Sequence, residues 1–208
     1  MDQTTFTATR LSLHVVAELL LAGPQYDASG SIALGATPRG FGCTAQPDVR
    51  VEGTDLVVGS RVVALDGRTV GEVATDAGLV PRPLDDLYGD GPGLGPEHPL
   101  SVEAESAAAI AEAFRAGEEA LAALAPDARR VLWPEHFDLG ITLDEVNYGV
   151  SPGDGFLPVP YAYVGPWTVP DGEFWNASFG AARPLAEVAD LLAFFAEGRD
   201  RAVSDRED

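Results

Sequence analysis

One short segment places an imidazole among carboxylates, because Glu135, His136 and Asp138 lie within four positions of one another. A histidine beside carboxylates can transfer protons near neutral pH or bind a metal ion. In a strand over 137–143, alternation puts His136 and Asp138 on one face and Glu135 on the other. The segment therefore favours His136 with Asp138 as an acid–base pair. The alternative is a structural pair in which the carboxylate only orients the ring.

A second set of titratable residues lies on the helix expected over residues 6–22. His14 and Glu18 are four positions apart, so they share one face of an α-helix and can form a hydrogen-bonded pair or supply two metal ligands. His136 could join them if the two halves of the chain pack together. The chain lacks the H-E-x-x-H spacing of a zinc site, so these residues stay weak metal candidates and no cofactor is predicted.

Aromatic residues are concentrated between Trp133 and Phe179, where ten of the chain's seventeen lie. Tyrosine and tryptophan bury large areas while keeping a polar group, which suits both cores and ligand pockets. In the pocket interpretation, nearby amides and a carboxylate orient the ligand. The alternative is an aromatic core with cross-strand pairs. The candidate ligand-binding residues are Trp133, Asn147, Tyr148, Asp154, Tyr161, Tyr163, Trp167, Trp175 and Asn176.

These patterns leave three functional hypotheses. The leading one is a soluble small-molecule-binding protein with an aromatic-lined pocket. The second is an enzyme that uses His136 with Asp138. The third is an interaction protein that associates with itself, which a contiguous exposed apolar patch would favour. The sequence names no substrate, and whether the chain is an enzyme stays open.

The elements that must position these residues form two sets of strands, each flanked by helices. A helix over 6–22, strands between 31 and 65 and a helix over 69–79 with Thr69 as N-cap make a first half, residues 1–80. Residues 81–100 are a proline- and glycine-rich acidic linker. A helix over 101–125, strands between 137 and 179 and a helix over 184–197 make a second half, residues 101–198, followed by a charged tail, 199–208.

This layout predicts an α+β fold with antiparallel strand sets, because the strands cluster instead of alternating with helices. The halves have a similar order of elements, which favours an internal duplication. The two halves are expected to form one compact unit.

Composition excludes several classes of partner. The net charge is −20, and arginine supplies every basic side chain, since the chain has no lysine. Such a surface repels phosphate backbones and anionic headgroups, so no nucleic acid and no membrane is expected as a partner. The single cysteine, Cys43, allows no internal disulfide, which fits a cytoplasmic location. A small-molecule ligand and a homo-oligomer both remain compatible with the sequence.

Four phrases in the second half carry a resemblance. They are Leu132-Trp-Pro-Glu-His-Phe-Asp-Leu, Asn147-Tyr-Gly-Val-Ser-Pro-Gly-Asp, Pro160-Tyr-Ala-Tyr-Val-Gly-Pro-Trp and Phe174-Trp-Asn-Ala-Ser-Phe-Gly-Ala. With these four phrases and two in the first half, Leu11-Ser-Leu-His and Thr37-Pro-Arg-Gly-Phe-Gly, the chain resembles a group of uncharacterised actinobacterial proteins. The resemblance implies a bacterial origin and an intact fold, and it transfers no activity and no catalytic residue.

Overall fold

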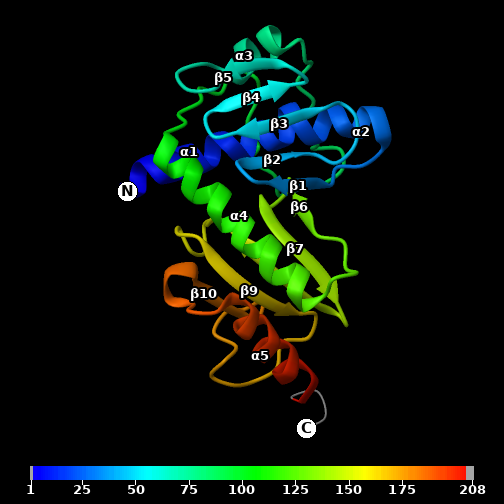
Figure 1. The fold of residues 1–208 in the computed structure, drawn as a ribbon, viewed down its shortest axis with the longest axis vertical. Helices are drawn as coiled ribbons and strands as arrows, with labels where there is room; N and C mark the ends of the chain where they lie inside the picture. The colour runs from blue at the N-terminus through cyan, green and yellow to red at the C-terminus, as the bar shows by residue number, and fades with distance from the viewer. Residues whose placement is uncertain (1, 205–208) are drawn as a thin grey trace. The chain divides into compact units, whose positions relative to one another are not determined.

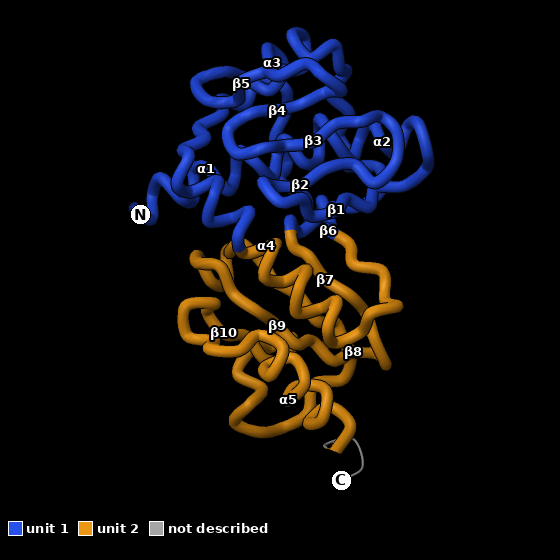
Figure 2. Tube along the Cα trace, in the orientation of Figure 1, with its two compact units in different colours: residues 1–112, 132–137 blue, residues 113–131, 138–208 orange. Residues whose placement is uncertain are grey.

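The computed structural model describes residues 2–204, and the chain divides into two compact units. Unit 1 comprises residues 1–112 and 132–137, and unit 2 comprises residues 113–131 and 138–208 (Figure 2). Residues 81–100, expected as a linker, lie within unit 1. The unit boundary at 112/113 falls inside a helix. Both units are discontinuous in sequence, because residues 132–137 belong to unit 1.

Unit 1 begins with one continuous helical stretch made of α1 (Gln3–Val16), the π-helix η1 (Ala17–Ala22) and α2 (Gly23–Ser29). We expected this helix to stop at Gly23-Pro24. It continues through Pro24, which has no N–H to donate, and the Leu19 carbonyl of η1 accepts a hydrogen bond from the Arg82 N–H at 3.0 Å. Gly23 is required there, since a Cβ would collide with the backbone of Arg82.

The strands of unit 1 are β1 (Leu34–Thr37), β2 (Gly40–Cys43), β3 (Val49–Glu52), β4 (Asp55–Val58) and β5 (Arg61–Ala64). Each pairs antiparallel with the next along the chain, and β6 (Val131–Trp133) adds beside β1 through Leu132. In β3 the buried and part-exposed residues alternate, as its Val-Arg-Val-Glu pattern predicts. η1 contacts β2 and β3, so the apolar residues of the helical stretch form the core against the sheet.

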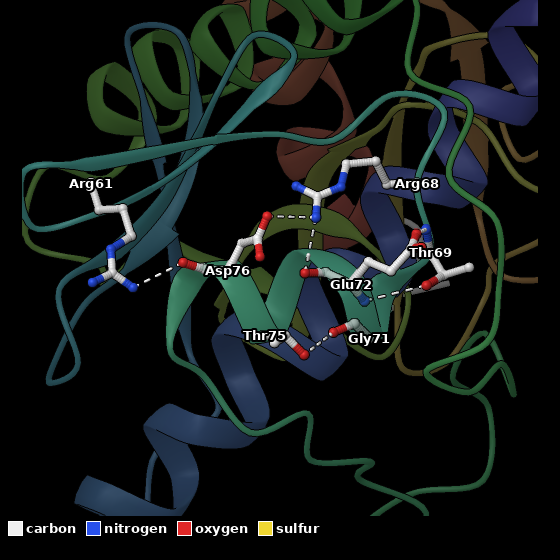
Figure 3. Close-up of polar contacts among 7 residues, drawn as sticks. All are labelled: Arg61, Arg68, Thr69, Gly71, Glu72, Thr75 and Asp76. Atoms are coloured by element: carbon white, nitrogen blue, oxygen red, sulfur yellow. Dashed lines mark hydrogen bonds and ion pairs between the residues drawn. The ribbon is translucent and has the colours of Figure 1, made fainter.

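α3 (Val70–Ala77) packs on β4 and β5. Thr69 is its N-cap, which confirms the expectation, and Glu72 closes a capping box by accepting a hydrogen bond from the Thr69 N–H at 2.8 Å. Figure 3 shows Arg68 bridging the Glu72 carbonyl and the Asp76 carboxylate, while Arg61 bonds the Asp76 carbonyl at the other end of the helix.

The helical stretch Gln3–Ser29 is long and apolar enough, by composition, to cross a membrane. Of its apolar window, 72% is buried inside the unit. A core helix of a globular unit passes the same test, and the contacts of η1 with the sheet give this apolar surface a structural role.

α4 (Ala104–Leu124) passes from unit 1 into unit 2. The sequence predicts that this helix begins at residue 101, and the structure begins it at Ala104. The Glu103 carboxylate accepts hydrogen bonds from the N–H groups of Glu105 and Ser106 at 2.8 and 2.7 Å. These bonds lower the pKa of Glu103, because they stabilise its charged form.

Unit 2 is built on β7 (Asp138–Leu143), β8 (Val146–Ser151), β9 (Tyr161–Pro166) and β10 (Ala181–Pro184), paired antiparallel in chain order (Figure 1). A 3-10 turn, η2 (Leu185–Glu187), leads to α5 (Leu191–Ser204), which contacts β8 and β9. α5 therefore takes in the start of the predicted charged tail, and residues 205–208 of that tail lie outside the described residues.

One face of the unit 2 sheet is apolar and packs closely against helices. A Cβ at Gly117 of α4 would lie 3.0 Å from Val150, and one at Gly198 of α5 would lie 2.6 Å from Val164. Tyr148 is fully buried on this face, with its ring edge-on to Phe195 at 6.1 Å. Helices and antiparallel strands in both units give the predicted α+β class, which is confirmed.

Candidate functional site

Two groups of titratable side chains stand out, one in each unit. The first, here called the carboxylate cluster, consists of Glu18, Tyr88, Asp90, Glu135 and His136 in unit 1. The second, called the tyrosine–aspartate cluster, consists of Asp138, Ser151, Asp154, Tyr161 and Tyr163 in unit 2. Each contains a buried carboxylate that accepts a hydrogen bond from a tyrosine.

Glu18 anchors the carboxylate cluster from the π-helix η1 and is only 2% exposed. Its Oε2 accepts a hydrogen bond from the Tyr88 hydroxyl at 3.0 Å. Burial raises the pKa of Glu18, the Tyr88 hydrogen bond partly offsets this rise, and the charge of Asp85 adds to it. π-Helical turns occur frequently at functional sites, and here the turn carries a carboxyl group that holds its proton more tightly than usual.

The segment after Tyr88 lies directly against Glu18. A Cβ at Gly91 would collide with the Glu18 carboxylate. Arg82, which precedes this segment, connects it to the helical stretch. Its N–H donates to the Leu19 carbonyl at 3.0 Å, and its guanidinium pairs with Asp27. Glu18 is therefore closed off by a segment some seventy residues further along the chain.

The outer side of this cluster brings together Asp90, Glu135 and His136, each offering one ligand atom within 4.8 Å of the others. The Nε2 of His136 lies 4.0 Å from the Glu135 carboxylate, and the His136 side chain is exposed. Burial raises the pKa of Tyr88, and the negative charges of Glu18 and Glu135 raise it further. The Tyr88 hydroxyl therefore stays protonated and is influenced by both carboxylates. Two carboxylates and an imidazole at this spacing could hold a divalent cation, and exposed acidic groups on such a surface also gather in this way without a metal ion.

The two histidine–carboxylate pairs expected from the sequence have other partners in the structure. His14 Nε2 lies 2.7 Å from the Pro134 carbonyl and its ring stacks on Phe137 at 5.3 Å, whereas Glu18 bonds Tyr88. Burial lowers the pKa of His14 to about 4, so its ring is neutral at pH 7 and its N–H donates to Pro134. The predicted His14–Glu18 pair assumes a regular α-helix, in which residues four positions apart share a face. Glu18 instead lies in the π-helix that begins at Ala17, where that spacing no longer applies.

The strand expected over 137–143 begins one residue later, at Asp138. Residues 134–137 form a turn, and Phe137 has a φ of 53°. The premise that His136 lies on the strand is therefore wrong, because the alternation of faces starts after it. His136 belongs to the carboxylate cluster of unit 1, and Asp138 belongs to unit 2.

The tyrosine–aspartate cluster lies on the face of the unit 2 sheet opposite to Tyr148. Tyr163 of β9 donates a hydrogen bond to the carboxylate of Asp138 on β7. To reach it, the ring crosses β8 above Gly149, where a Cβ would lie 2.5 Å from Tyr163 Cζ. Gly140 of β7 also leaves space, since its Cβ would lie 2.9 Å from the Tyr163 hydroxyl. The absence of a side chain at both glycines thus leaves the space in which the Tyr163 ring reaches Asp138.

A second tyrosine–aspartate hydrogen bond lies on the same face of the sheet. The Tyr161 hydroxyl donates to Asp154 Oδ2 at 2.6 Å, while Asp154 Oδ1 accepts from the N–H groups of Phe156 and Leu157 at 2.8 and 2.9 Å. Ser151 Oγ accepts from the Gly153 N–H at 3.1 Å. Burial raises the pKa of both tyrosines, and the adjacent carboxylates raise it further, so both are hydroxyl donors at neutral pH.

Of the nine candidate ligand-binding residues, the structure brings together Asp154, Tyr161 and Tyr163. Tyr148 faces α5, and Trp175 is buried with its ring edge-on to Phe174. The other four lie apart from the cluster. Asn176 bonds Ala182 and Arg183, Asn147 bonds Thr142, Trp167 is 67% exposed after β9, and Trp133 is an exposed residue of unit 1.

Sequence reasoning missed two members of the carboxylate cluster, Tyr88 and Asp90, and one residue beside the tyrosine–aspartate cluster, Phe156. Tyr88 and Asp90 lie in the proline-rich segment that we interpreted as a linker, and no local pattern connects them to Glu18. Phe156 is also missed, although it is 51% exposed and its ring contacts Tyr161 at 6.1 Å. Its position two residues after Asp154 in a turn was the available signal.

Large apolar side chains are exposed in both units, among them Val62, Val80, Phe156 and Trp167. Self-association through such side chains stays a hypothesis. Comparisons with protein-family models, with curated proteins and with solved structures found no match for this chain, so the functional argument rests on the side-chain geometry described above.

Proposed function

We propose that the chain binds a small organic molecule at the tyrosine–aspartate cluster of unit 2. The observation that carries this proposal is the pair of tyrosine–carboxylate hydrogen bonds, Tyr163 to Asp138 and Tyr161 to Asp154, on one face of the same sheet. The two rings are 6.4 Å apart. Binding sites combine aromatic surface with a few fixed polar groups in this way.

Stability alone gives a weak reason for this arrangement. Asp138 is 9% exposed, and a buried carboxylate loses hydration that its hydrogen bonds only partly replace. An apolar pair at these positions would pack the sheet without that cost. The two glycines beneath the ring of Tyr163 also give up strand propensity. Costs of this kind are typical of positions kept for ligand recognition.

The accessible side of the cluster is formed by Asp154, Phe156 and Tyr163. Asp154 and Tyr163 are partly exposed and Phe156 is half exposed, while Asp138, Ser151 and Tyr161 are buried behind them. The buried members hold the accessible ones in place, which lowers the entropy lost when a ligand binds.

A thermal-shift screen of the full chain against a metabolite library tests the proposal. A ligand present at about 100 times its Kd stabilises a protein by about 2.7 kcal/mol, which raises the Tm by several degrees in a chain of this size. Tyr163→Phe should abolish the shift. Tyr26→Phe is the matched control, because Tyr26 lies in unit 1 and its ring contact with Arg82 does not need the hydroxyl. A library without any hit, or a hit equally strong in Tyr163→Phe, would refute the proposal.

The second candidate function is acid–base catalysis at the carboxylate cluster of unit 1. The observation that favours it is Glu18, a buried carboxyl group with a raised pKa, held by Tyr88 near an exposed histidine–carboxylate group. Such a group can donate a proton at a higher pH than an exposed glutamate. In this version His136 acts with Glu135 and Asp90 in place of Asp138.

Turnover assays with ester, phosphoester and glycoside probes test this candidate. Glu18→Gln and His136→Asn should each remove the turnover, while a change at His98, a partly exposed histidine outside the cluster, to asparagine (His98→Asn) should keep it. If all three variants retain full turnover of a probe, the carboxylate cluster is not its catalytic site.

A further inference from the structure

We propose that the ligand of the tyrosine–aspartate cluster is a small organic cation, an ammonium or alkylated ammonium group; this rests on the function proposed above and specifies its ligand class. The observation behind it is the combination of the partly exposed carboxylate of Asp154 with a group of contacting aromatic rings, those of Phe156, Tyr161, Tyr163 and Phe179.

The charge of Asp154 is the first step of the argument. Its three hydrogen-bond donors, the N–H groups of Phe156 and Leu157 and the hydroxyl of Tyr161, are all neutral. Among the ion pairs of residues 2–204, none includes Asp154. Neutral donors bring no positive charge to this carboxylate, so a cation placed beside it gains electrostatic attraction that no protein cation already supplies there.

Three arginines of unit 2, Arg130, Arg183 and Arg199, have partners away from this cluster. Arg183 of β10 is registered opposite Ala162, which places it on the α5 side of the sheet, where it bonds Asn176 and lies over Phe174. Arg130 pairs with Glu118, and Arg199 pairs with Asp144. These pairs leave the negative potential at the cluster in place, so an anionic ligand would be repelled.

The aromatic rings are the second step. Phe156 is edge-on to both Tyr161 and Phe179, at 6.1 and 5.1 Å, and Tyr161 lies 6.4 Å from Tyr163. The faces of such rings carry negative electrostatic potential and attract cations, and groups of rings bind alkylated ammonium ions well. A neutral ligand of the same shape would gain the apolar contact without this attraction.

Isothermal titration of the full chain with three probes tests the ligand class: choline, its isosteric neutral analogue 3,3-dimethylbutan-1-ol, and the smaller anion trimethylacetate, which keeps the tert-butyl group. We expect choline to bind at least about tenfold more tightly than the neutral analogue, because cation–π attraction and the carboxylates both favour it. Trimethylacetate should bind the least. This comparison uses the unmodified protein and does not depend on the folding of any variant.

Two charge variants locate the effect. Asp154→Asn should reduce choline affinity by about tenfold, because it removes the charge and keeps an acceptor oxygen. Asp171→Asn removes one exposed negative charge elsewhere in unit 2 and should leave the affinity within about twofold, since exposed charges at a distance are screened.

The outcomes separate this inference from the function on which it rests. Binding of the neutral or anionic probe as tight as that of choline, or failure of all three probes to bind, overturns the cation inference. The proposed function survives either result if a library compound still shifts the Tm of the wild type and not that of Tyr163→Phe. If no library compound does so, both proposals fall.

Discussion

The carboxylate cluster and the tyrosine–aspartate cluster use the same local chemistry in different settings. In each, a tyrosine hydroxyl donates to a carboxylate that is largely removed from water. In unit 2 the partners lie on β7 and β9 of one sheet, twenty-five residues apart. In unit 1 the partners are seventy residues apart, and the tyrosine comes from an irregular segment folded over a helix. The comparison shows that strand register can build such a pair, and that a covering segment can do so equally well.

The two settings leave different surfaces accessible. Unit 1 buries Glu18 under Tyr88 and Gly91 and exposes an aspartate and a histidine outside. Unit 2 buries Asp138 and exposes part of a ring, Phe156, beside a second carboxylate. We propose proton transfer for the first surface and recognition of an organic group for the second. Four measurements test this contrast, from the largest expected effect to the smallest.

Gly149→Ala should have the largest effect. Its Cβ would lie 2.5 Å from Tyr163 Cζ and 2.6 Å from the Leu139 carbonyl, so either the ring or the backbone must move. We expect a loss of about 3 kcal/mol in the free energy of unfolding, the upper range for overpacking, measured by urea denaturation. Gly155→Ala is the control, because a Cβ there meets no atom within 4 Å. Equal stability of the two variants would show that Tyr163 does not need the space left by this glycine.

Tyr163→Phe and Tyr88→Phe compare the two hydrogen bonds directly. Each removes the hydroxyl from a buried carboxylate, which should cost about 1–3 kcal/mol at pH 7. Tyr26→Phe, which removes a hydroxyl outside both clusters, should change stability by less than about 0.5 kcal/mol. A cost for either cluster variant no greater than for this control means that its hydrogen bond is not stabilising.

The pH dependence of Glu18→Gln distinguishes unit 1 further. The pKa of Glu18 is raised in the folded state, so the folded protein keeps a proton that the unfolded chain releases. Wild-type stability is therefore complete below the unfolded pKa, about 4.3, and falls as the pH rises from there through the raised folded pKa. Glutamine keeps an acceptor for Tyr88 and does not ionise. The Tm of the variant relative to wild type should thus rise between pH 4 and pH 7. A difference independent of pH would contradict the raised pKa.

Glu135→Gln should have the smallest effect on stability. The Glu135 side chain is partly exposed and lies 4.0 Å from the exposed His136, a geometry worth about 0–1 kcal/mol at most. We expect a change of less than about 0.5 kcal/mol in urea denaturation. A loss above about 2 kcal/mol would show that the outer side of the carboxylate cluster is a structural element of unit 1.

Much of the local structure follows from the sequence. The Thr69–Glu72 spacing predicts the cap of α3, and alternation predicts β3 and the shared face of Tyr161 and Tyr163. These features depend on residues within four positions of each other, so propensity and periodicity are sufficient to predict them. The clustering of strands likewise predicts the α+β class.

The candidate sites depend on contacts that no local pattern encodes. Tyr163 meets Asp138 because the register of three strands places two glycines beneath its ring. Tyr88 meets Glu18 because a segment without regular structure folds back over a π-helix. The sequence by itself determined the class of fold and pointed to many of the residues with binding or proton-transfer chemistry, but not to Tyr88, Asp90 or Phe156. Only the tertiary structure decided which of them meet, because long-range packing and strand register, not spacing along the chain, bring these side chains within hydrogen-bond distance.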